Sequence, residues 1–193
     1  MNATPSQHMT AEEFADRKFD FPDGGRWTEL VAGELETFEP PDDAHGNFVR
    51  TLSAALADFA QETQEGYACF ELGLIVRRNP DTVRCPPISY FTTGERFAEQ
   101  DKLVTEVRPA LVVEIASTND RRRQMAVRVQ EYLDWGVSLV WVADTHARKV
   151  LAFEAGRQKR EYEAHQTLYG GSILSGFQAR VEDLFADPKW WRS

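Results

Sequence analysis

The chain has 193 residues, of which 42% are hydrophobic, and its net charge is −9. This length and apolar content predict one folded domain with a substantial core, and they exclude wholesale disorder. No apolar run approaches the roughly 18 residues that a membrane-spanning helix needs. With 22 Lys and Arg against 31 Asp and Glu, the charge disfavours tight nucleic-acid binding but leaves room for a locally positive groove.

The cysteines and the N-terminus favour a cytoplasmic location. Cys69 and Cys85 lack the spacing of a metal site, and they suit a reduced chain better than a disulfide framework. The N-terminus has neither the charged nor the apolar region of a secretory signal. We expect residues 1–8 to form a flexible extension, residues 9–187 the domain and residues 188–193 a C-terminal tail.

The first third of the chain predicts a helix, a hairpin and a long helix. Thr10 and Glu13 have the spacing of a capping box, which predicts a short helix after Thr10. Residues 26–40 alternate around a central glycine and predict two short strands. Residues 42–64 predict a helix of four to five turns with an Asp-rich cap, because apolar side chains recur at helical spacing. These side chains are Phe48, Leu52, Leu56 and Phe59.

Residues 67–91 predict two strands joined by the turn "RNPD". The second strand contains an unusual pair, Pro86 and Pro87, in the stretch "TVRCPPISYF". Proline cannot donate a hydrogen bond to a sheet and is normally confined to edges, strand starts or bulges. The pair therefore needs an explanation beyond strand formation.

The second half predicts a strand, a helix and a parallel strand. Residues 109–117, "PALVVEIAS", form a nearly all-apolar run typical of a strand covered on both faces. A helix capped by Asn119 or Asp120 and ended by Gly136 leads to a second buried strand at residues 137–144. A helix of this length permits a right-handed crossover between parallel strands.

The remaining segments complete a mixed sheet. Residues 149–156 are expected to pair with the strand before them, and residues 173–185 predict a short strand followed by a helical turn. The predicted fold class is α/β, a single domain with a mixed β-sheet flanked by helices.

Glu114 is the most informative candidate site residue. It lies within "ALVVEIAS", where an unpaired buried charge would cost several kcal/mol. Its place near the end of the strand predicts a site at the carboxyl edge of the sheet. The alternative is a structural salt bridge to one of Arg121 to Arg123 or to Arg128.

Two further carboxylates are candidates. Pairing across the predicted hairpin brings Glu71 near position 87, and a register shift of one residue decides whether it faces Glu114. Glu29, in "RWTELVAGEL", is the best acid of the N-terminal region, although a solvated strand residue explains it equally well.

The other polar residues favour structural or surface roles. His45 begins the long helix, where capping or exposure is commoner than catalysis, and His146 and His165 fall in loops. The run Arg121 to Arg123 could meet phosphates, but a solvated helix start is the favoured interpretation. The sequence contains no Ser–His–Asp pattern, phosphate-binding glycine loop or HExxH motif.

Taken together, the segments resemble the Uma family of restriction-endonuclease-like proteins, which has the PD-(D/E)XK nuclease fold. The resemblance covers most of the chain and rests on the order and spacing of several segments. They are "MTAEEFADR", "GGRWTELVAGEL", "PPDDAHGNFVRTLSAAL", "LVVEIAS" followed by "QEYLDWGVSLVWVAD", and "ILSGFQARVEDLF".

The resemblance implies a metal-dependent nuclease site. In the family, an Asp that follows a proline and a Glu on the next strand hold a divalent metal, usually Mg²⁺, and a lysine comes from the central helix. In this chain Pro87 stands at the Asp position and Arg128 at the lysine position, while Glu114 is retained. Glu114 is therefore the expected metal ligand, with Glu71 as the candidate replacement for the lost Asp.

These replacements predict a degenerate metal site with little or no nuclease activity. Proline offers no side-chain ligand, and arginine stays protonated at neutral pH, so it cannot act as a general base. We expect a binding or assembly protein, a homodimer in which Trp190 and Trp191 could take part, with DNA as the partner that the resemblance implies.

Two alternatives stay open. One is an active Mg²⁺-dependent endonuclease in which Glu71 or Glu29 replaces the Asp and Arg128 stabilises the transition state. The other is a small-molecule or protein-binding module around Glu114 and Arg128.

Overall fold

The computed structural model describes residues 8–188 and Trp191. Most of the expected N-terminal extension, and Trp190, lie outside the described residues. Within the described part of the chain, every helix is too short or too polar to cross a membrane.

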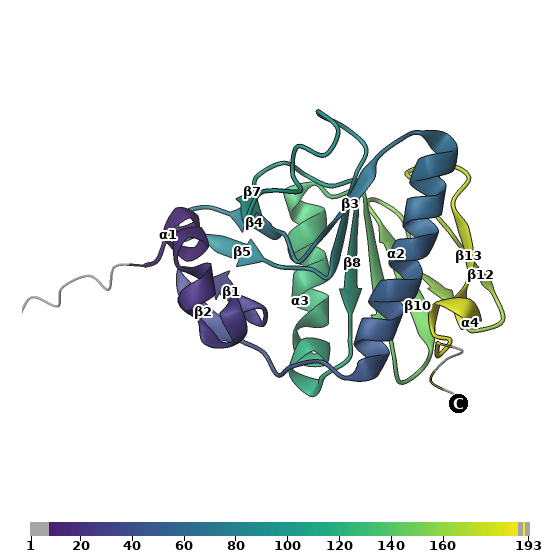
Figure 1. Ribbon diagram of the computed structural model, residues 1–193, viewed down its shortest axis with the longest axis horizontal. Coiled ribbons are helices and arrows are strands. Elements are labelled where there is room, and N and C mark those ends of the chain that lie inside the picture. Colours follow the sequence, from purple (N-terminus) through teal and green to yellow (C-terminus); the bar gives the residue numbers. More distant parts are fainter. Residues whose placement is uncertain (1–7, 189–190, 192–193) are drawn as a thin grey trace, which may run out of the picture.

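The described residues fold into two main sheets and four α-helices (Figure 1). The five-stranded sheet, in the order β2-β1-β5-β4-β7, contains β1 (Thr28–Val31), β2 (Glu34–Thr37), β4 (Gly73–Arg77), β5 (Thr82–Arg84) and β7 (Val104–Thr105). The six-stranded sheet, in the order β11-β10-β9-β8-β6-β3, contains β3 (Tyr67–Phe70), β6 (Ile88–Phe91), β8 (Leu111–Ile115), β9 (Leu139–Asp144), β10 (Lys149–Glu154) and β11 (Arg160–Tyr162).

The other elements cover these sheets. A two-stranded ribbon consists of β12 (Thr167–Tyr169) and β13 (Gln178–Arg180). The helices are α1 (Ala11–Asp16), α2 (Asp43–Thr63), α3 (Asn119–Trp135) and α4 (Val181–Leu184), with short 3₁₀ turns at Lys18–Asp20 and Pro22–Gly25. The predicted α/β class is confirmed, but the strands divide between two main sheets, a division that the sequence patterns did not indicate.

The predicted hairpin at residues 67–91 exists, but it bends and joins both sheets. The pairs Phe70↔Ile88 and Leu74↔Arg84 share one register, so the two sides of the hairpin stay aligned throughout. Between these pairs the ladder is interrupted, and a hydrogen bond of 3.4 Å runs from the Glu71 amide to the Pro87 carbonyl.

Each of the two predicted strands is therefore divided in two, and the prolines lie at the division of the second strand. Pro86 and Pro87 lie between β5 and β6, where the chain passes from one sheet to the other. A residue in this break needs no ladder N–H, so the missing donor of proline costs nothing there. Opposite them Glu71 has a left-handed φ of 51°, which turns the other side of the hairpin.

The helix ends follow the sequence signals closely. Thr10 and Glu13 form the predicted capping box. Helix α2 follows its N-cap, Asp42, and with 21 residues it is longer than predicted. The N-cap of α3 is Thr118 rather than Asn119 or Asp120, and Gly136 ends that helix with a φ of 106°, as predicted.

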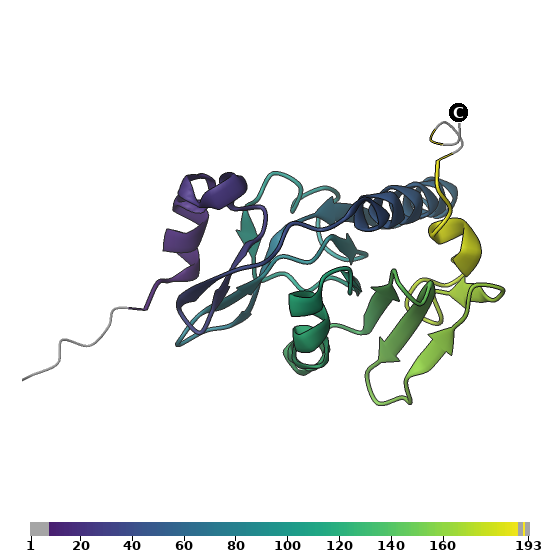
Figure 2. The same cartoon turned by 90° about the horizontal axis from the view of Figure 1, so that it is seen from below.

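The strands β8 and β9 are parallel and joined through α3, which confirms the predicted unit. Strand β10 pairs antiparallel with β9, also as predicted. Helix α3 contacts β4 of one sheet and β8 and β9 of the other, and Figure 2 shows it between the two groups of strands.

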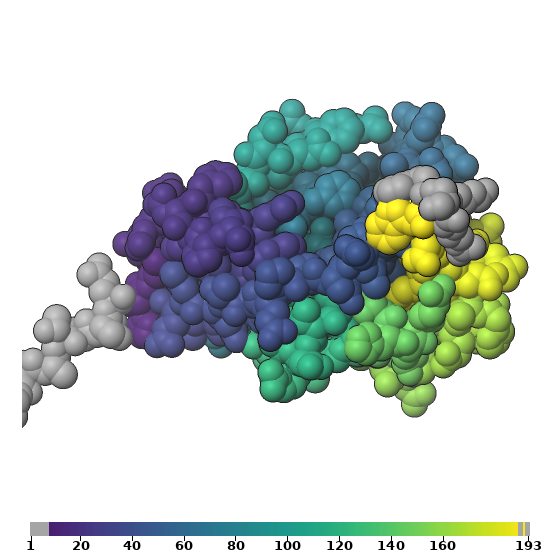
Figure 3. Space-filling view, turned by 60° about the horizontal axis from the view of Figure 1, so that its bottom comes forward, coloured from purple at the N-terminus to yellow at the C-terminus, as the bar shows by residue number. Residues whose placement is uncertain are grey.

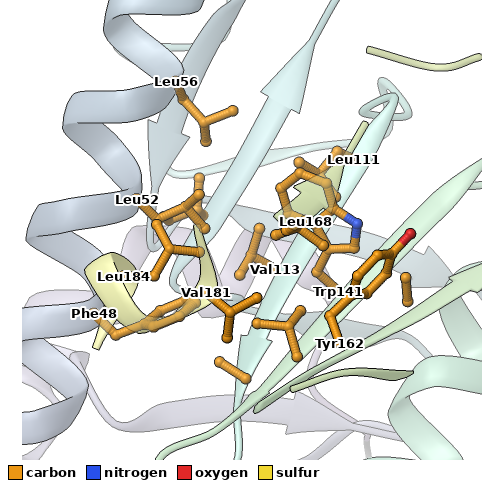
Figure 4. Packing of buried hydrophobic residues seen from close by; sticks show 14 of the residues in the cluster. Phe48, Leu52, Leu56, Leu111, Val113, Trp141, Tyr162, Leu168, Val181 and Leu184 are labelled. Atoms are coloured by element: carbon orange, nitrogen blue, oxygen red, sulfur yellow. The ribbon is translucent and has the colours of Figure 1, made fainter. Parts of the chain in front are cut away.

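The six-stranded sheet is covered on both faces. Leu111, Val113 and Ile115 share one core with α2, and Figure 4 shows the side chains of α2 pointing at this face of β8. Val112 packs in a second core with α3. Because side chains alternate along a strand, Glu114 faces α3 as Val112 does.

Leu52 tests the packing of α2 on the sheet. This side chain is fully buried in the shared core, so Leu52→Ala should lower the free energy of unfolding by about 2–5 kcal/mol. Urea denaturation at pH 7 measures the change, with Val127→Ala on the exposed side of α3 as a control that should stay within about 0.5 kcal/mol. A loss below about 1 kcal/mol for Leu52→Ala would contradict this packing.

Candidate functional site

Two carboxylates from different sheets point at α3. Glu114 comes from β8 and is fully buried on its α3 side. Glu29 comes from β1, whose neighbouring Leu30 packs in a core on the opposite face with Val83. Glu29 is buried as well, so its interpretation as a solvated strand residue is wrong.

Arg128 lies between these two carboxylates. It belongs to the buried face of α3, one turn from Tyr132. Its Nη1 and Nη2 donate to the two oxygens of Glu29 at 2.6 and 2.7 Å. Its Nε and Nη2 donate to Oε1 of Glu114 at 3.0 and 2.7 Å. The guanidinium therefore links β1 of one sheet to β8 of the other.

Three further donors complete this buried cluster. Arg84 Nη1 and the Cys85 amide donate to Glu29 at 3.1 and 2.8 Å. The hydroxyl of Tyr132 donates to Oε1 of Glu114 at 2.7 Å. The sequence patterns did not indicate that these residues belong to the site. A signal existed for Arg84, because it follows Val83 in a strand and must occupy the opposite face.

The cluster joins three carboxylate side chains and two guanidinium groups, because Arg84 also contacts Glu131 at 2.8 Å. Burial alone would raise the pKa of Glu29, but the charge and hydrogen bonds of Arg128, with the charge of Arg84, lower it to about 2. Burial likewise opposes the charged form of Arg128, yet Glu114 and Glu29 raise its pKa well above the usual value. Glu29 and Arg128 are therefore both ionised at neutral pH.

The residues at this position do not fit a Mg²⁺ ion. Such an ion needs a near-octahedral shell of oxygen ligands. Both oxygens of Glu29 and Oε1 of Glu114 already accept hydrogen bonds, which leaves Oε2 of Glu114, a buried atom without a partner. Pro87 offers no side-chain ligand, and within the described residues no three His, Cys, Asp or Glu side chains cluster in a way that could hold a metal.

Glu71 lies beside Pro87 through the backbone, but its carboxylate points elsewhere. The carboxylate is half-exposed and pairs with Arg26 at 3.8 Å. The carbonyl of Glu71 accepts a hydrogen bond of 3.3 Å from Nζ of Lys18, a buried lysine that also contacts Cys85 Sγ at 3.8 Å. Among the described residues, Glu71 makes no side-chain contact with Glu29, Glu114 or Arg128.

A cavity of about 640 Å³ opens beside Pro87. The start of α2, the residues before β1, the end of β3 and the C-terminal residues surround it, and Figure 3 shows the face where blue α2 meets the yellow C-terminal residues. Its walls are formed by Arg26, Trp27, Pro41, Asp42, Asp43, His45, Gly46, Asn47, Val49, Arg50, Phe70, Glu71, Pro87, Pro188 and Trp191. Glu29, Glu114 and Arg128 lie outside these walls.

His45 is buried in the wall of this cavity rather than exposed at the helix start. Its Nδ1 lies 3.0 Å from Oγ of Ser117. Burial, and then the positive charge of Arg121, lower its pKa to about 4, so the ring is neutral at pH 7. By contrast, His146 and His165 are exposed, as expected for loop residues.

The arginine run at the start of α3 differs from its predicted solvated state. Arg123 is exposed, but Arg122 is only partly so and Arg121 is buried. The guanidinium of Arg121 lies 4.9 Å from the ring centre of Phe38 and 5.9 Å from that of Trp27. The solvated interpretation is therefore wrong for Arg121.

Comparisons with known proteins identify a family and a similar fold. A family model named Uma2, described as "Putative restriction endonuclease", matches residues 11–182. A crystal structure of "a putative nuclease belonging to DUF820" from Anabaena variabilis ATCC 29413 superposes with a TM-score of 0.74 at 17% identity, covering 92% of this chain and 97% of that one. This likeness confirms the predicted nuclease-like fold. A comparison with curated proteins found no match.

The variant Arg128→Met tests the buried bridge. It keeps most of the side-chain length but leaves Glu29 and Glu114 without their shared cation, so the free energy of unfolding should fall by about 3–5 kcal/mol. Urea denaturation at pH 7 measures this loss. Arg123→Met, on the exposed side of the same helix, is the matched control and should stay within about 0.5 kcal/mol. Equal effects of the two changes would contradict the bridge.

The acid limb of stability tests the ionisation of Glu29. Its pKa is about 2 when folded and about 4.3 when unfolded. Because the folded pKa is the lower one, its contribution of about 3 kcal/mol is present above pH 4.3 and disappears as pH falls toward 2. Chemical denaturation from pH 7 to pH 2 should therefore show a shallower decline for Glu29→Gln, which is already less stable at pH 7. Parallel curves would refute this assignment.

Proposed function

The chain belongs to the Uma2 family, and we propose that it is a member with a closed metal site, which acts by binding rather than by phosphodiester hydrolysis. The observation that supports this proposal most directly is the position of Arg128. Its guanidinium supplies the positive charge between Glu29 and Glu114 and uses the oxygens that a metal ion would need.

Displacing this guanidinium would be costly. A metal ion entering between the two carboxylates would leave Arg128 buried without its counter-ions, and such uncompensated charges cost several kcal/mol. Mg²⁺ also gives up its water shell reluctantly. Competition between the ion and Arg128 therefore favours the arginine at ordinary magnesium concentrations.

The remaining residues offer no replacement chemistry. Arg128 cannot serve as a general base, because the adjacent carboxylates raise its pKa further. Pro87 presents a ring to the cavity where the family pattern has an Asp. The carboxylate of Glu71, one candidate for a migrated ligand, pairs with Arg26 instead.

An active Mg²⁺-dependent endonuclease is the second candidate, and one observation favours it. Glu29 does approach the same guanidinium as Glu114, so two carboxylates converge as a metal site requires. This candidate needs Arg128 to leave its bidentate position when DNA and metal bind.

Further properties follow from family membership and from the sequence. We propose DNA as the partner class, a cytoplasmic location and a homodimer. Trp191, the described tryptophan of the C-terminal tail, is partly exposed and could contribute to such a dimer.

Plasmid nicking and metal binding test the proposal together. The wild-type protein should not nick supercoiled DNA with Mg²⁺ or Mn²⁺, and calorimetry should detect no Mn²⁺ binding. The double change Pro87→Asp with Arg128→Lys restores an oxygen ligand and removes the bidentate guanidinium group. The doubly substituted protein should therefore bind Mn²⁺.

A matched control, Pro86→Asp with Arg128→Lys, places the new carboxylate one residue away. This control should bind Mn²⁺ more weakly than the protein with Pro87→Asp and Arg128→Lys. The proposal fails if the wild-type protein nicks DNA in a metal-dependent manner and Glu114→Ala abolishes that activity. Failure of the double variant to bind metal, with its fold intact, would instead refute the assignment of position 87.

A further inference from the structure

Strand β3 is an edge strand that lacks the usual protection of an edge. It ends the six-stranded sheet beside β6, and its sequence "YACF" carries no charge. The edge strand β2 carries Glu34 and Glu36, and β7 has only two residues. The edge strand β11 carries Arg160 and Glu161. Charges and short lengths are the normal protection, because the open backbone groups of an edge otherwise pair with another chain.

The backbone groups of Ala68 and Phe70 point away from the sheet. Ala68 pairs in register with Tyr90, whose carbonyl accepts a hydrogen bond of 2.8 Å from the Ala110 amide on the far side of β6. Because alternate residues of a strand bond to the same neighbour, Ala68 and Phe70 face outward. A hydrogen bond of 3.4 Å from Nε2 of Gln100 to the Ala68 carbonyl agrees with this direction.

The segment that passes beside this edge does not replace a strand. Within the described residues, no backbone hydrogen bond joins residues 92–102 to β3. Phe70 and Phe97 flank the edge and are 53% and 48% exposed. The outward amides and carbonyls of β3 are therefore available to a further strand once the Gln100 side chain moves.

A hollow lies on each side of the β3 edge. One has a volume of about 360 Å³ and lies against α2, which contacts β3 (Figure 1). The other has a volume of about 330 Å³ and adjoins Cys69 and Leu72, which pack in the core shared with α3. Because side chains alternate between the faces of a strand, an added strand would place its side chains in the two hollows in turn.

The two hollows differ in chemistry. The α2-side hollow is mainly apolar and, among the described residues, has Arg96 as its one charged side chain. The other contains two acids, Glu99 and Asp101, and one cation, Lys102. Lys102 bonds Oε1 of Glu99 at 2.8 Å, whereas Oε2 of this buried carboxylate has no partner in the described part of the chain. Burial, and then the charge of Glu99, raise the pKa of Cys69 to about 11, as expected beside an acidic hollow.

This charge distribution decides which kind of strand fits. If β3 of a second copy paired antiparallel with this edge, the two-fold axis would keep each face on its own side. Glu99 and Asp101 would then lie on the same face as their counterparts, and facing like charges are destabilising. A strand with basic side chains on this face is attracted instead.

We propose that the β3 edge binds an extended basic segment of a partner protein as a further antiparallel strand. Apolar side chains of the segment enter the α2-side hollow, and its lysine or arginine side chains meet Glu99 and Asp101. The inference goes beyond the closed metal site and does not depend on it. Neither hollow is lined by Glu29, Glu114 or Arg128.

Peptides of defined sequence test the inference by fluorescence anisotropy. An end-capped hexapeptide of alternating valine and lysine should bind at least about tenfold more tightly than one of alternating valine and glutamate. In the antiparallel complex, the residues opposite Ala68 and Phe70 are the valines, and their N–H groups point at β3. N-methylation of the valines should therefore abolish binding, whereas N-methylation of the lysines, whose N–H groups point away, should preserve it.

Two pairs of variants locate the groups. Phe70→Ala should weaken binding of the valine–lysine peptide at least about fivefold. Its control is Tyr169→Ala, a 51% exposed aromatic outside both hollows. Asp101→Asn should weaken binding about two- to fivefold, while Asp134→Asn, an exposed acid outside both hollows, should leave it unchanged. Because all four side chains are exposed, the variants should stay folded.

No saturable binding of the valine–lysine peptide would overturn the inference, as would equal affinity of its two N-methylated forms. A dimer in sedimentation that Phe70→Ala dissociates would also overturn it, because a second copy would then occupy the edge. None of these results would alter the closed metal site, which nicking and Mn²⁺ binding test separately.

Discussion

The guanidinium of Arg128 is the link on which the rest of the structure depends. It contacts Glu29 from one sheet and Glu114 from the other, so a cation of α3 joins the two sheets. Neither carboxylate could be buried as an ion alone, and Arg128 could not be buried without them. The position of α3 between the sheets and the ionisation of Glu29 thus have one physical origin.

We propose that the same interaction that joins the sheets also closes the position at which the family pattern expects a metal. The internal guanidinium needs no ligand from outside, and it holds both oxygens of Glu29 and Oε1 of Glu114 in hydrogen bonds. Mg²⁺ would instead need a near-octahedral shell of oxygen ligands. Pro87 complements this arrangement, because it removes a ligand and occupies the break where the hairpin passes between sheets. The cavity beside Pro87 has polar and aromatic walls.

Local patterns predicted most of the elements, because periodicity and capping depend on near neighbours. For this reason the sequence could predict the parallel unit around α3, and it could offer the salt bridge of Glu114 with Arg128 as an alternative. The burial of Glu29 could not be predicted, since it depends on which face of a distant sheet α3 covers. Nor could a pattern show that the hairpin at residues 67–91 bends between sheets, or that Arg121 is buried between Trp27 and Phe38. These features arise from packing between segments that are far apart in the sequence. Such packing leaves no trace in the local pattern of charged and apolar residues.

The most direct measurement is a crystal structure of the protein grown with Mn²⁺, with anomalous scattering recorded to locate the ion. The account predicts no anomalous peak between Glu29 and Glu114, and density for the Arg128 guanidinium in contact with both carboxylates. An ion there with a complete oxygen shell, and Arg128 displaced from its bidentate position, would contradict it.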